Sequence, residues 1–257
     1  MSTLLAPLLG LLLSAAPAEA TWSILAIDPD TREVGVAGAT CGPFVWGIAG
    51  VAPGEGVVAA QYATWRRGRR EAVDQLNEGD APDEILDWLL TEDRKPELRQ
   101  WAILRLDGSF ASATGDEVEG QAEIIAGEGF SVQGNTLRPG VVKAAAAAVE
   151  AAAGEPLEDR LLAGLLAGAE AGGDKRCSAK DAAKSAFLYV AGPDDRAREP
   201  TVEVRASGAG APWEVAEKLR DGRMSCSAPG GRAVGAGWGL VGLVGAALLR
   251  RGRRSAR

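Results

Sequence analysis

The sequence contains no histidine among its 257 residues. This absence excludes catalytic triads with a histidine base, histidine ligands to a metal, and histidine acid–base catalysis. A catalytic site must therefore use threonine, serine, cysteine, aspartate, glutamate or lysine side chains, or a terminal amine. We expect neither a metal nor another cofactor.

Positive charge is scarce in the body of the chain. The formal net charge is −7, and residues 21–225 alone carry −12, because the last 32 residues hold six arginines and no acidic residue. Phosphate groups are bound by clustered cations, so the acidic body argues against a nucleic-acid partner. A basic cluster within the body is expected to be a solvated helix face, with lipid headgroups as alternative contacts; it consists of Arg66, Arg67, Arg69 and Arg70.

The N-terminus has the pattern of a cleaved secretion signal. Residues 4–15 form an apolar run too short to span a bilayer comfortably, and Ala18-Glu19-Ala20 follows it. Signal peptidases accept this A-x-A pattern, and a cut after Ala20 leaves Thr21 as the first residue. No lysine or arginine precedes the apolar run, and an uncleaved N-terminal membrane anchor is the alternative interpretation.

The C-terminus carries a second membrane signal. Residues 233–249 are 17 consecutive uncharged residues, enough for a helix of about 25 Å. Five arginines follow, which predicts a cytoplasmic flank and therefore a transmembrane helix; a buried core helix fits this arginine cluster poorly. The predicted organisation is a signal peptide (1–20), a globular domain (21–221), a short linker (222–232), the transmembrane or sorting segment (233–249) and a basic cytoplasmic tail (250–257).

The same C-terminal region resembles a known sorting signal. The stretch Cys226-Ser-Ala-Pro-Gly-Gly, an apolar run that includes Trp238, and the arginine tail are similar to the MYXO-CTERM tag of myxobacterial surface proteins. The resemblance implies that Cys226 is processed and lipidated, so that the globular domain stays tethered to the cell surface. It leaves open whether the helix is retained or removed.

Cysteine is rare, with three residues in the chain. In an exported protein Cys41 and Cys177 are able to pair, because disulfides persist in oxidising compartments. The sequence does not give the distance between them. A buried free thiol at Cys41, within an apolar strand, is an equal alternative.

Periodicity and turn residues predict an α+β domain in which antiparallel sheets are covered by helices. Residues 127–135 are expected to form a glycine-rich loop, and no phosphate-binding glycine motif or internal repeat is present. The predicted strands are 21–27, 33–40, 56–61, 99–106, 109–114, 121–126, 184–191 and 201–206. The predicted helices are 66–78, 82–91, 140–153, 156–171 and 212–220.

An N-terminal threonine at position 21 provides a nucleophile and a base in one residue. Its hydroxyl oxygen attacks, and its own α-amine, with an ordinary pKa of about 7.7–8.0, takes the proton. This chemistry suits a chain without histidine. The alternative is that an exported protein begins with threonine by chance.

From Thr21 to about Arg220 the chain resembles the domain of unknown function 1028 family, which has an N-terminal-nucleophile (Ntn) hydrolase-like fold. The resemblance implies a four-layer αββα sandwich with the nucleophile, Thr21, at the start of the first strand. The motifs that carry it are Thr21-Trp22-Ser23-Ile24, Asp28-Pro29, Cys41-Gly42, Arg99-Gln100, the nine residues from Gly127 to Asn135, and Gly172-Gly173-Asp174-Lys175-Arg176.

Two further segments supply candidate site residues. In the predicted loop, Ser131, Gln133 and Asn135 are candidates for substrate or oxyanion contacts, with a structural turn as the equal alternative. Asp174, Lys175 and Arg176 are candidates for orienting the Thr21 amine or binding an acidic substrate group, with a solvated loop as the alternative. The chain has no lysine before Lys95, so the lysine that proteasome-type relatives place near the nucleophile is missing.

The sequence thus predicts an exported, surface-tethered hydrolase of amide or related acyl bonds. Its substrate, a small molecule or peptide-like compound, is not specified by the sequence, and oligomerisation is left open. The alternative is a catalytically silent binding or structural domain displayed on the cell surface.

Overall fold

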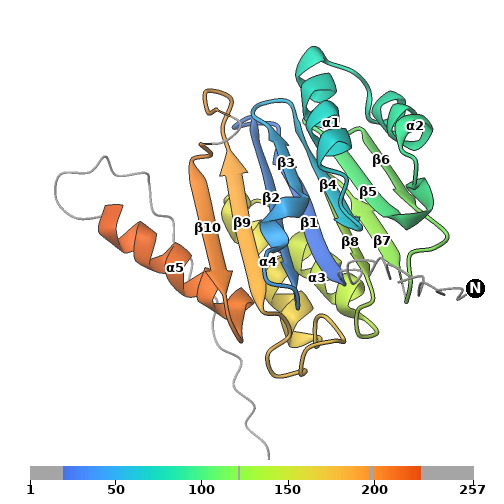
Figure 1. Cartoon of the computed structure of the whole chain (residues 1–257). Helices are drawn as coiled ribbons and strands as arrows, with labels where there is room; N and C mark the ends of the chain where they lie inside the picture. The colour runs from blue at the N-terminus through green and yellow to red at the C-terminus, as the bar shows by residue number, and fades with distance from the viewer. Residues whose placement is uncertain (1–19, 121, 197–198, 227–257) are drawn as a thin grey trace, which may run out of the picture. The chain divides into compact units, whose positions relative to one another are not determined.

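The computed structural model describes residues 20–226 except 121, 197 and 198. This part of the chain is an α+β fold with two antiparallel sheets and five α-helices (Figure 1), which confirms the predicted class. Within the described range no helix is both long and apolar enough to cross a membrane. The predicted signal peptide up to residue 19, the predicted transmembrane segment 233–249 and the basic tail lie outside the described residues.

The larger sheet has six strands, with β1 and β2 at its centre. β1 pairs with β2 on one side, where Thr21 lies opposite Thr40, and with β8 on the other, where Thr21 lies opposite Asn135. The first residue of β1 therefore lies between two polar cross-strand neighbours. The strand order is β10 (Val202–Ser207), β9 (Ser185–Ala191), β2 (Glu33–Thr40), β1 (Thr21–Asp28), β8 (Phe130–Asn135) and β7 (Glu123–Gly127).

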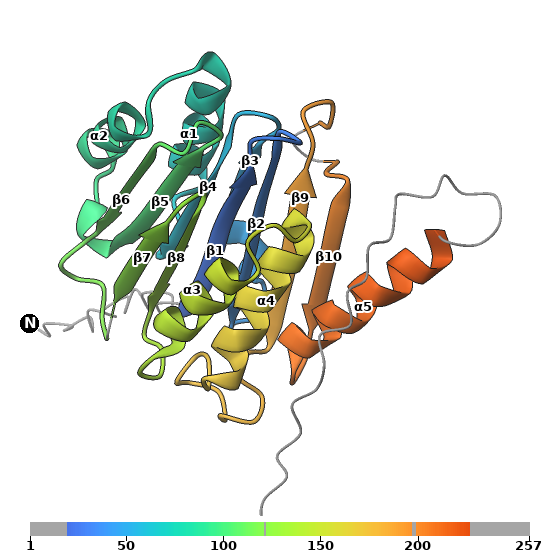
Figure 2. The same ribbon diagram turned by 180° about the vertical axis from the view of Figure 1, so that it is seen from behind.

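The smaller sheet has four strands and packs face to face with the larger one, as Figure 2 shows from behind. Its last two strands form a hairpin through Asp107 and Gly108, between the predicted strands 99–106 and 109–114. β3 is a strand that sequence periodicity missed, because its four residues, two alanines, a glycine and a valine, carry almost no pattern. The order is β3 (Ala49–Ala52), β4 (Gly56–Tyr62), β5 (Arg99–Arg105) and β6 (Phe110–Thr114).

Helices cover the outer face of each sheet (Figures 1 and 2). α1 and α2 pack on the four-stranded sheet, and α3 and α4 pack on the six-stranded sheet. Gly79, in the left-handed conformation, ends α1, and a proline begins α2, as the sequence predicts. The bounds are α1 (Arg66–Glu78), α2 (Pro82–Glu92), α3 (Val141–Ala151), α4 (Leu157–Glu170) and α5 (Ala211–Cys226), so that 222–226, expected within a linker, are helical.

Alternation along β1 divides its side chains between two cores. Trp22 and Ile24 pack with α3 and α4, whereas Leu25 and Ile27 pack between the two sheets. Thr21 and Ser23 share the parity of Leu25 and Ile27, so they face the space between the sheets.

The predicted loop 127–135 is wrong for most of its length, because Phe130–Asn135 is the strand β8. Gly127 is the last residue of β7, and only the turn at Glu128 and Gly129 remains, with Gly129 at φ 68°. Polar and apolar residues alternate along this segment with the period of two that is typical of a strand. Its polar residues, Ser131, Gln133 and Asn135, are all buried. A buried polar face contradicts the usual rule that the apolar face of a strand is the buried one, and this is why the strand was missed.

Candidate functional site

The space between the sheets changes character along its length. At the Asp28 end of β1 it is filled by aliphatic and aromatic side chains. At the Thr21 end the inward-facing side chains are polar and nevertheless fully buried. They are Thr21, Ser23, Thr40, Gln61, Gln100, Ser131, Gln133, Asn135 and Ser185. Burying this many polar groups between two sheets is unfavourable unless they are hydrogen-bonded, so each of them is expected to have a hydrogen-bond partner.

Six of these side chains form a chain of hydrogen bonds across both sheets: Ser23, Gln61, Gln100, Ser131, Gln133 and Asn135. Ser131 Oγ donates to Gln133 Oε1 (3.0 Å), and Gln133 Nε2 donates to Ser23 Oγ (2.7 Å). Ser23 Oγ donates to Gln61 Oε1 (2.9 Å), and Gln61 Nε2 donates to Gln100 Oε1 (2.6 Å). The chain therefore links β8 and β1 of one sheet to β4 and β5 of the other.

One backbone group fixes the direction of the whole chain. Gln100 Nε2 donates to the carbonyl oxygen of Gly134 (3.1 Å), which is able only to accept. The other atom of the Gln100 amide must then be the oxygen, so both groups that contact it, Gln61 Nε2 and Asn135 Nδ2 (3.1 Å), are donors. This assignment leaves Asn135 Oδ1 as a buried acceptor without a partner.

A second polar cluster surrounds the peptide bond that precedes Thr21. The carbonyl oxygen of Ala20 accepts hydrogen bonds from Thr40 Oγ1 and from Arg176 Nη2 (3.0 Å). Arg176 Nη2 also lies 2.7 Å from Asp174 Oδ2 and 3.1 Å from Thr40 Oγ1. Asp174 is fully buried, whereas the Arg176 side chain is 31% exposed. The guanidinium thus connects solvent to the start of β1.

The loop that carries Asp174 and Arg176 is fixed to the sheet by several independent contacts. Asp174 Oδ2 accepts from the backbone N–H of Cys41 at 2.6 Å. Cys41 and Cys177 form a disulfide, with Cα atoms 5.6 Å apart, so the alternative of a free thiol at Cys41 does not hold. Arg138 Nη2 donates to the carbonyl oxygen of Cys177 at 2.7 Å. The loop is therefore held at both sides of Arg176.

Two of the four described non-glycine residues with positive φ lie around the same cluster. Thr136 and Ala182 have φ of 52° and 54°, a left-handed conformation that non-glycine residues rarely adopt. The carbonyl oxygen of Thr136 accepts from Lys175 N, and that of Ala182 accepts from Asp174 N. Gly134 is closely packed, since a Cβ there would lie 2.2 Å from Leu137 Cδ1 and 3.2 Å from the carbonyl oxygen of Thr21. Strained and tightly packed backbone of this kind is typical of functional sites.

The structure separates the residues that sequence reasoning grouped together. Ser131, Gln133 and Asn135 lie in the buried chain, and Asp174 lies in the cluster at Ala20. The side chain of Lys175, by contrast, is exposed beside it. Cys226, the candidate for lipidation, is the last residue of α5.

The sequence analysis missed three residues of the site. Thr40, Gln61 and Gln100 lie at or near the ends of predicted strands, and a polar residue at a strand end is a weak signal. Arg176 is among the predicted candidates, but its contact with the carbonyl oxygen of Ala20 is not visible in the sequence, because the two residues are 156 positions apart.

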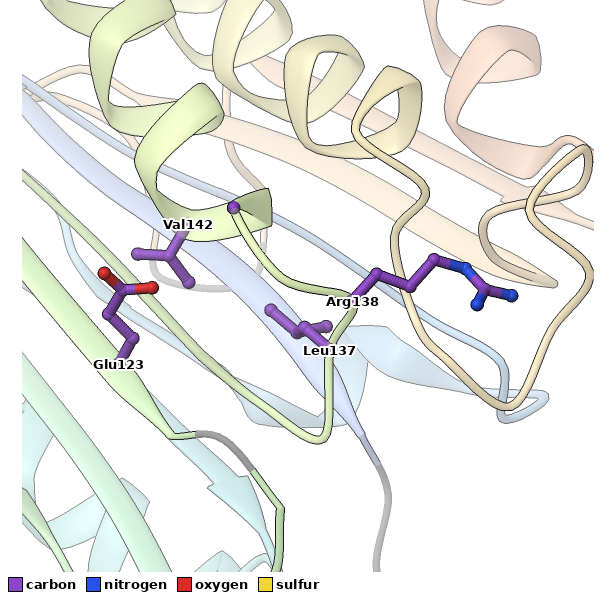
Figure 3. A pocket seen from close by; sticks show the side chains of 5 residues that line it. Glu123, Leu137, Arg138 and Val142 are labelled. Atoms are coloured by element: carbon purple, nitrogen blue, oxygen red, sulfur yellow. The ribbon is translucent and has the colours of Figure 1, made fainter.

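The described residues line two hollows, of which the first borders the loop of Asp174 through Leu137. The first, shown in Figure 3, is lined by Glu123, Leu137, Arg138, Gly140 and Val142 and holds only about 10 Å³, roughly one water molecule. The second is an open depression of about 350 Å³, lined in part by Pro29, beyond the opposite end of β1 from Thr21. Its two arginines, Arg32 and Arg105, already pair with Glu55 and Asp107. Neither hollow competes with the Thr21 region as a candidate site.

Comparison with known proteins agrees with these observations. No curated protein matches the chain. Among solved structures, the crystal structure of protein SPO2555 from Silicibacter pomeroyi, described there with the family model DUF1028, superimposes with a TM-score of 0.68. It is 27% identical and covers 79% of this chain and 88% of its own. The family model described as "Family of unknown function (DUF1028)" matches residues 21–215, beginning at the threonine that opens β1. The chain therefore belongs to the DUF1028 family.

Proposed function

We propose that removal of residues 1–20 makes this chain an exported hydrolase of amide or related acyl bonds, with Thr21 as the nucleophile and its α-amine as the base. The proposal includes an Ntn-hydrolase-like assignment of the fold, because two face-to-face antiparallel sheets lie between helix layers and Thr21 opens a central strand. The start of the family match at residue 21 supports a processed chain that begins there.

The observation that carries the proposal is the pair of donors on the carbonyl oxygen of Ala20. Thr40 Oγ1 and Arg176 Nη2 hold a carbonyl oxygen directly beside Thr21. Cleavage after Ala20 removes this carbonyl and leaves both donors able to bind the carbonyl oxygen of an incoming acyl substrate. In acyl-transfer catalysis, fixed hydrogen-bond donors of this kind stabilise the negative charge that develops on the substrate carbonyl oxygen in the transition state.

The chemical steps follow from these positions. The Thr21 hydroxyl oxygen attacks the substrate carbonyl carbon while the α-amine takes the hydroxyl proton. The resulting oxyanion is stabilised by Thr40 and Arg176, and Asp174 holds the guanidinium in place. Collapse of the tetrahedral adduct passes the proton to the leaving amine or alcohol and forms an ester on Thr21. Water then hydrolyses this ester and restores the free hydroxyl.

Export and surface tethering are part of the same proposal. The Cys41–Cys177 disulfide is of a kind that persists in oxidising compartments, which supports a location outside the cytoplasm. The tether itself, through Cys226 or the segment 233–249, is proposed from the sequence pattern.

Two variants test the role of Thr21. Thr21→Ala removes the nucleophile, and one additional residue before Thr21 displaces the free amine. We expect both to keep the far-ultraviolet circular dichroism spectrum of the processed protein and to lose all hydrolysis of a library of N-acyl amides and esters. Turnover that persists in both variants contradicts the proposal. A processed protein that is inactive, and whose N-terminus no acyl electrophile labels, indicates a silent binding domain instead.

A further inference from the structure

The buried oxygen Oδ1 of Asn135 is an acceptor without a donor. Within the described residues, four buried side-chain nitrogen or oxygen atoms have no hydrogen-bond partner, and Asn135 Oδ1 is the only acceptor among them. The other three are ring nitrogens of two tryptophans and the Nε of Arg160. Asn135 Oδ1 lies at the polar end of the space between the sheets. A buried acceptor in this position points to a donor that the described residues of the uncleaved chain do not supply.

Exchange of the Asn135 amide oxygen and nitrogen does not remove the problem. Gln100 Oε1 is an acceptor, because Gln100 Nε2 is committed to the Gly134 carbonyl oxygen. The Asn135 atom that lies 3.1 Å from Gln100 Oε1 must therefore be the nitrogen. The network thus orients the amide and turns its oxygen away from Gln100.

Thr21 is the strand residue that lies across from Asn135. The two are cross-strand partners in the β1–β8 pair and share the inward face, so their Cβ atoms are about 4.5–5.5 Å apart. On its other side, β7 begins at Glu123, which pairs with Gly134 rather than with Asn135. Thr21 is thus the cross-strand neighbour that is able to supply a donor.

We infer that Asn135 Oδ1 accepts a hydrogen bond from the α-amine of processed Thr21 and orients this amine beside the Thr21 hydroxyl. The inference rests on the proposed function, since it requires the chain to begin at Thr21. Before cleavage the Thr21 nitrogen is an amide with one N–H. Cleavage gives it two or three N–H bonds, which supply the missing donor. Asn135 is then a positioning residue and does not touch the substrate.

The surroundings of the amine set the expected electrostatics. β2, β4 and β5 present the neutral side chains of Thr40, Gln61 and Gln100. The charged groups at this site are Asp174 and Arg176 on the loop, and they pair with each other. A carboxylate introduced at Asn135 is therefore a new charge next to the amine, and it favours the protonated form.

Carbamoylation by cyanate measures this amine without any substrate, because cyanate reacts with the unprotonated form. The rate at the Thr21 amine is followed by mass spectrometry of the N-terminal peptide between pH 5 and 10, in the processed protein and in two variants. We expect Asn135→Asp to raise the midpoint of the pH profile of this carbamoylation rate by about one pH unit or more. Asn135→Ala is expected to lower the same midpoint. The control Gln133→Glu adds a carboxylate two cross-strand pairs further along β8, opposite Ser23, and is expected to shift the midpoint of the pH profile less than Asn135→Asp does.

A measurement on the unaltered protein guards against variants that fail to fold. The ¹³C resonance of the Asn135 side-chain carbonyl should titrate with the same midpoint as the carbamoylation rate. A resonance that does not titrate, or midpoints that are equal in all folded variants, overturns the inference. Failure of this inference is distinguishable from failure of the proposed function. The carbamoylation rate reports the protonation of the Thr21 amine and does not depend on whether the protein hydrolyses any substrate.

Discussion

At the scale of single residues, Arg176 joins three groups that are far apart in the chain. Its guanidinium contacts Ala20, Thr40 and Asp174, and its side chain is partly exposed. A guanidinium held by a buried carboxylate is a fixed positive charge with donors in a rigid fork. This geometry suits a group that binds a carbonyl oxygen or carboxylate arriving from solvent. The neighbouring Lys175 has the same charge but is exposed, and its backbone N–H donates to the carbonyl oxygen of Thr136.

The difference between these two neighbours makes a matched pair of variants. We expect Arg176→Ala to slow acylation of processed Thr21 by an activated ester at least about 100-fold, a loss typical of one oxyanion donor. Lys175→Ala should change the rate less than about twofold. Rates are measured by mass spectrometry of the N-terminal peptide. Equal rates for Arg176→Ala and the unaltered protein contradict the role given to Arg176.

At the scale of elements, the buried hydrogen-bond chain is what joins the two sheets beside Thr21. Gln100 is its branching point, because it accepts from Gln61 and Asn135 and donates to the Gly134 carbonyl oxygen. Its amide also donates to Thr114 Oγ1 at the exposed end of the chain of bonds. Loss of the branching point leaves several buried groups unpaired at once, which costs more than the loss of a peripheral bond.

Substitution of Gln100 by leucine should therefore be strongly destabilising. We expect Gln100→Leu to lower the free energy of unfolding by about 3 kcal/mol or more, because each orphaned buried group costs about 1–3 kcal/mol. Thr114→Val, at the exposed end, should cost less than about 1 kcal/mol. Urea denaturation of the processed protein checks both. Similar losses for the two variants show that the network is not cooperative.

The disulfide acts on the placement of the loop that carries Arg176. It connects the residue after β2 to the residue after Arg176, with 136 positions between the cysteines. Removal of a native disulfide commonly costs about 2–5 kcal/mol. We expect the double variant Cys41→Ala, Cys177→Ala to melt at a lower temperature than the parent and to be insensitive to reductant. Calorimetry with and without a thiol reductant tests this, and an unchanged melting temperature in both comparisons contradicts it.

At the scale of the whole molecule, the order of secondary structure is readable from the sequence, whereas the site is not. Alternation and turn residues predict β1, β2, β4 and the β5–β6 hairpin within two residues of their ends. Patterns of this kind report which face of an element is apolar. They do not report which residues meet across 156 positions, as Ala20 and Arg176 do.

The error at β8 has the same physical origin. Ser131, Gln133 and Asn135 alternate with period two, but they point into the interior. A strand with a buried polar face is stable only because a partner sheet supplies Gln61 and Gln100 opposite it. The information needed to recognise this strand therefore lies in β4 and β5, outside the segment itself.

Stability of the fold should depend on pH through Glu33 at the start of β2. Burial raises the pKa of the Glu33 carboxyl, a hydrogen bond from Thr31 opposes the shift, and Glu158, Asp28 and Asp195 add to it. A carboxyl whose folded pKa lies above its unfolded pKa binds protons more tightly in the folded state. Its ionised form therefore destabilises the fold at neutral pH, and this penalty is lost as the pH falls through the raised folded pKa.

Neutralising this residue should remove the penalty. We expect Glu33→Gln to raise the melting temperature at pH 7 and to leave it unchanged below the ordinary value of 4.5. The exposed Asp30→Asn in the same hairpin serves as the control and should shift stability by less than about 0.5 kcal/mol. A stabilisation by Glu33→Gln that is equal at pH 4 and pH 7 contradicts this explanation.

The central claim is that the hydroxyl of Thr21, as the first residue of the processed protein, forms the covalent intermediate. Protein recovered from its native source, treated with an acyl electrophile such as a β-lactone and mapped by mass spectrometry, tests it directly. We expect an N-terminal peptide that begins at Thr21 and carries one acyl group as an ester on its side-chain oxygen. An N-terminus at another residue, or an unmodified Thr21 after exhaustive treatment, would contradict the claim.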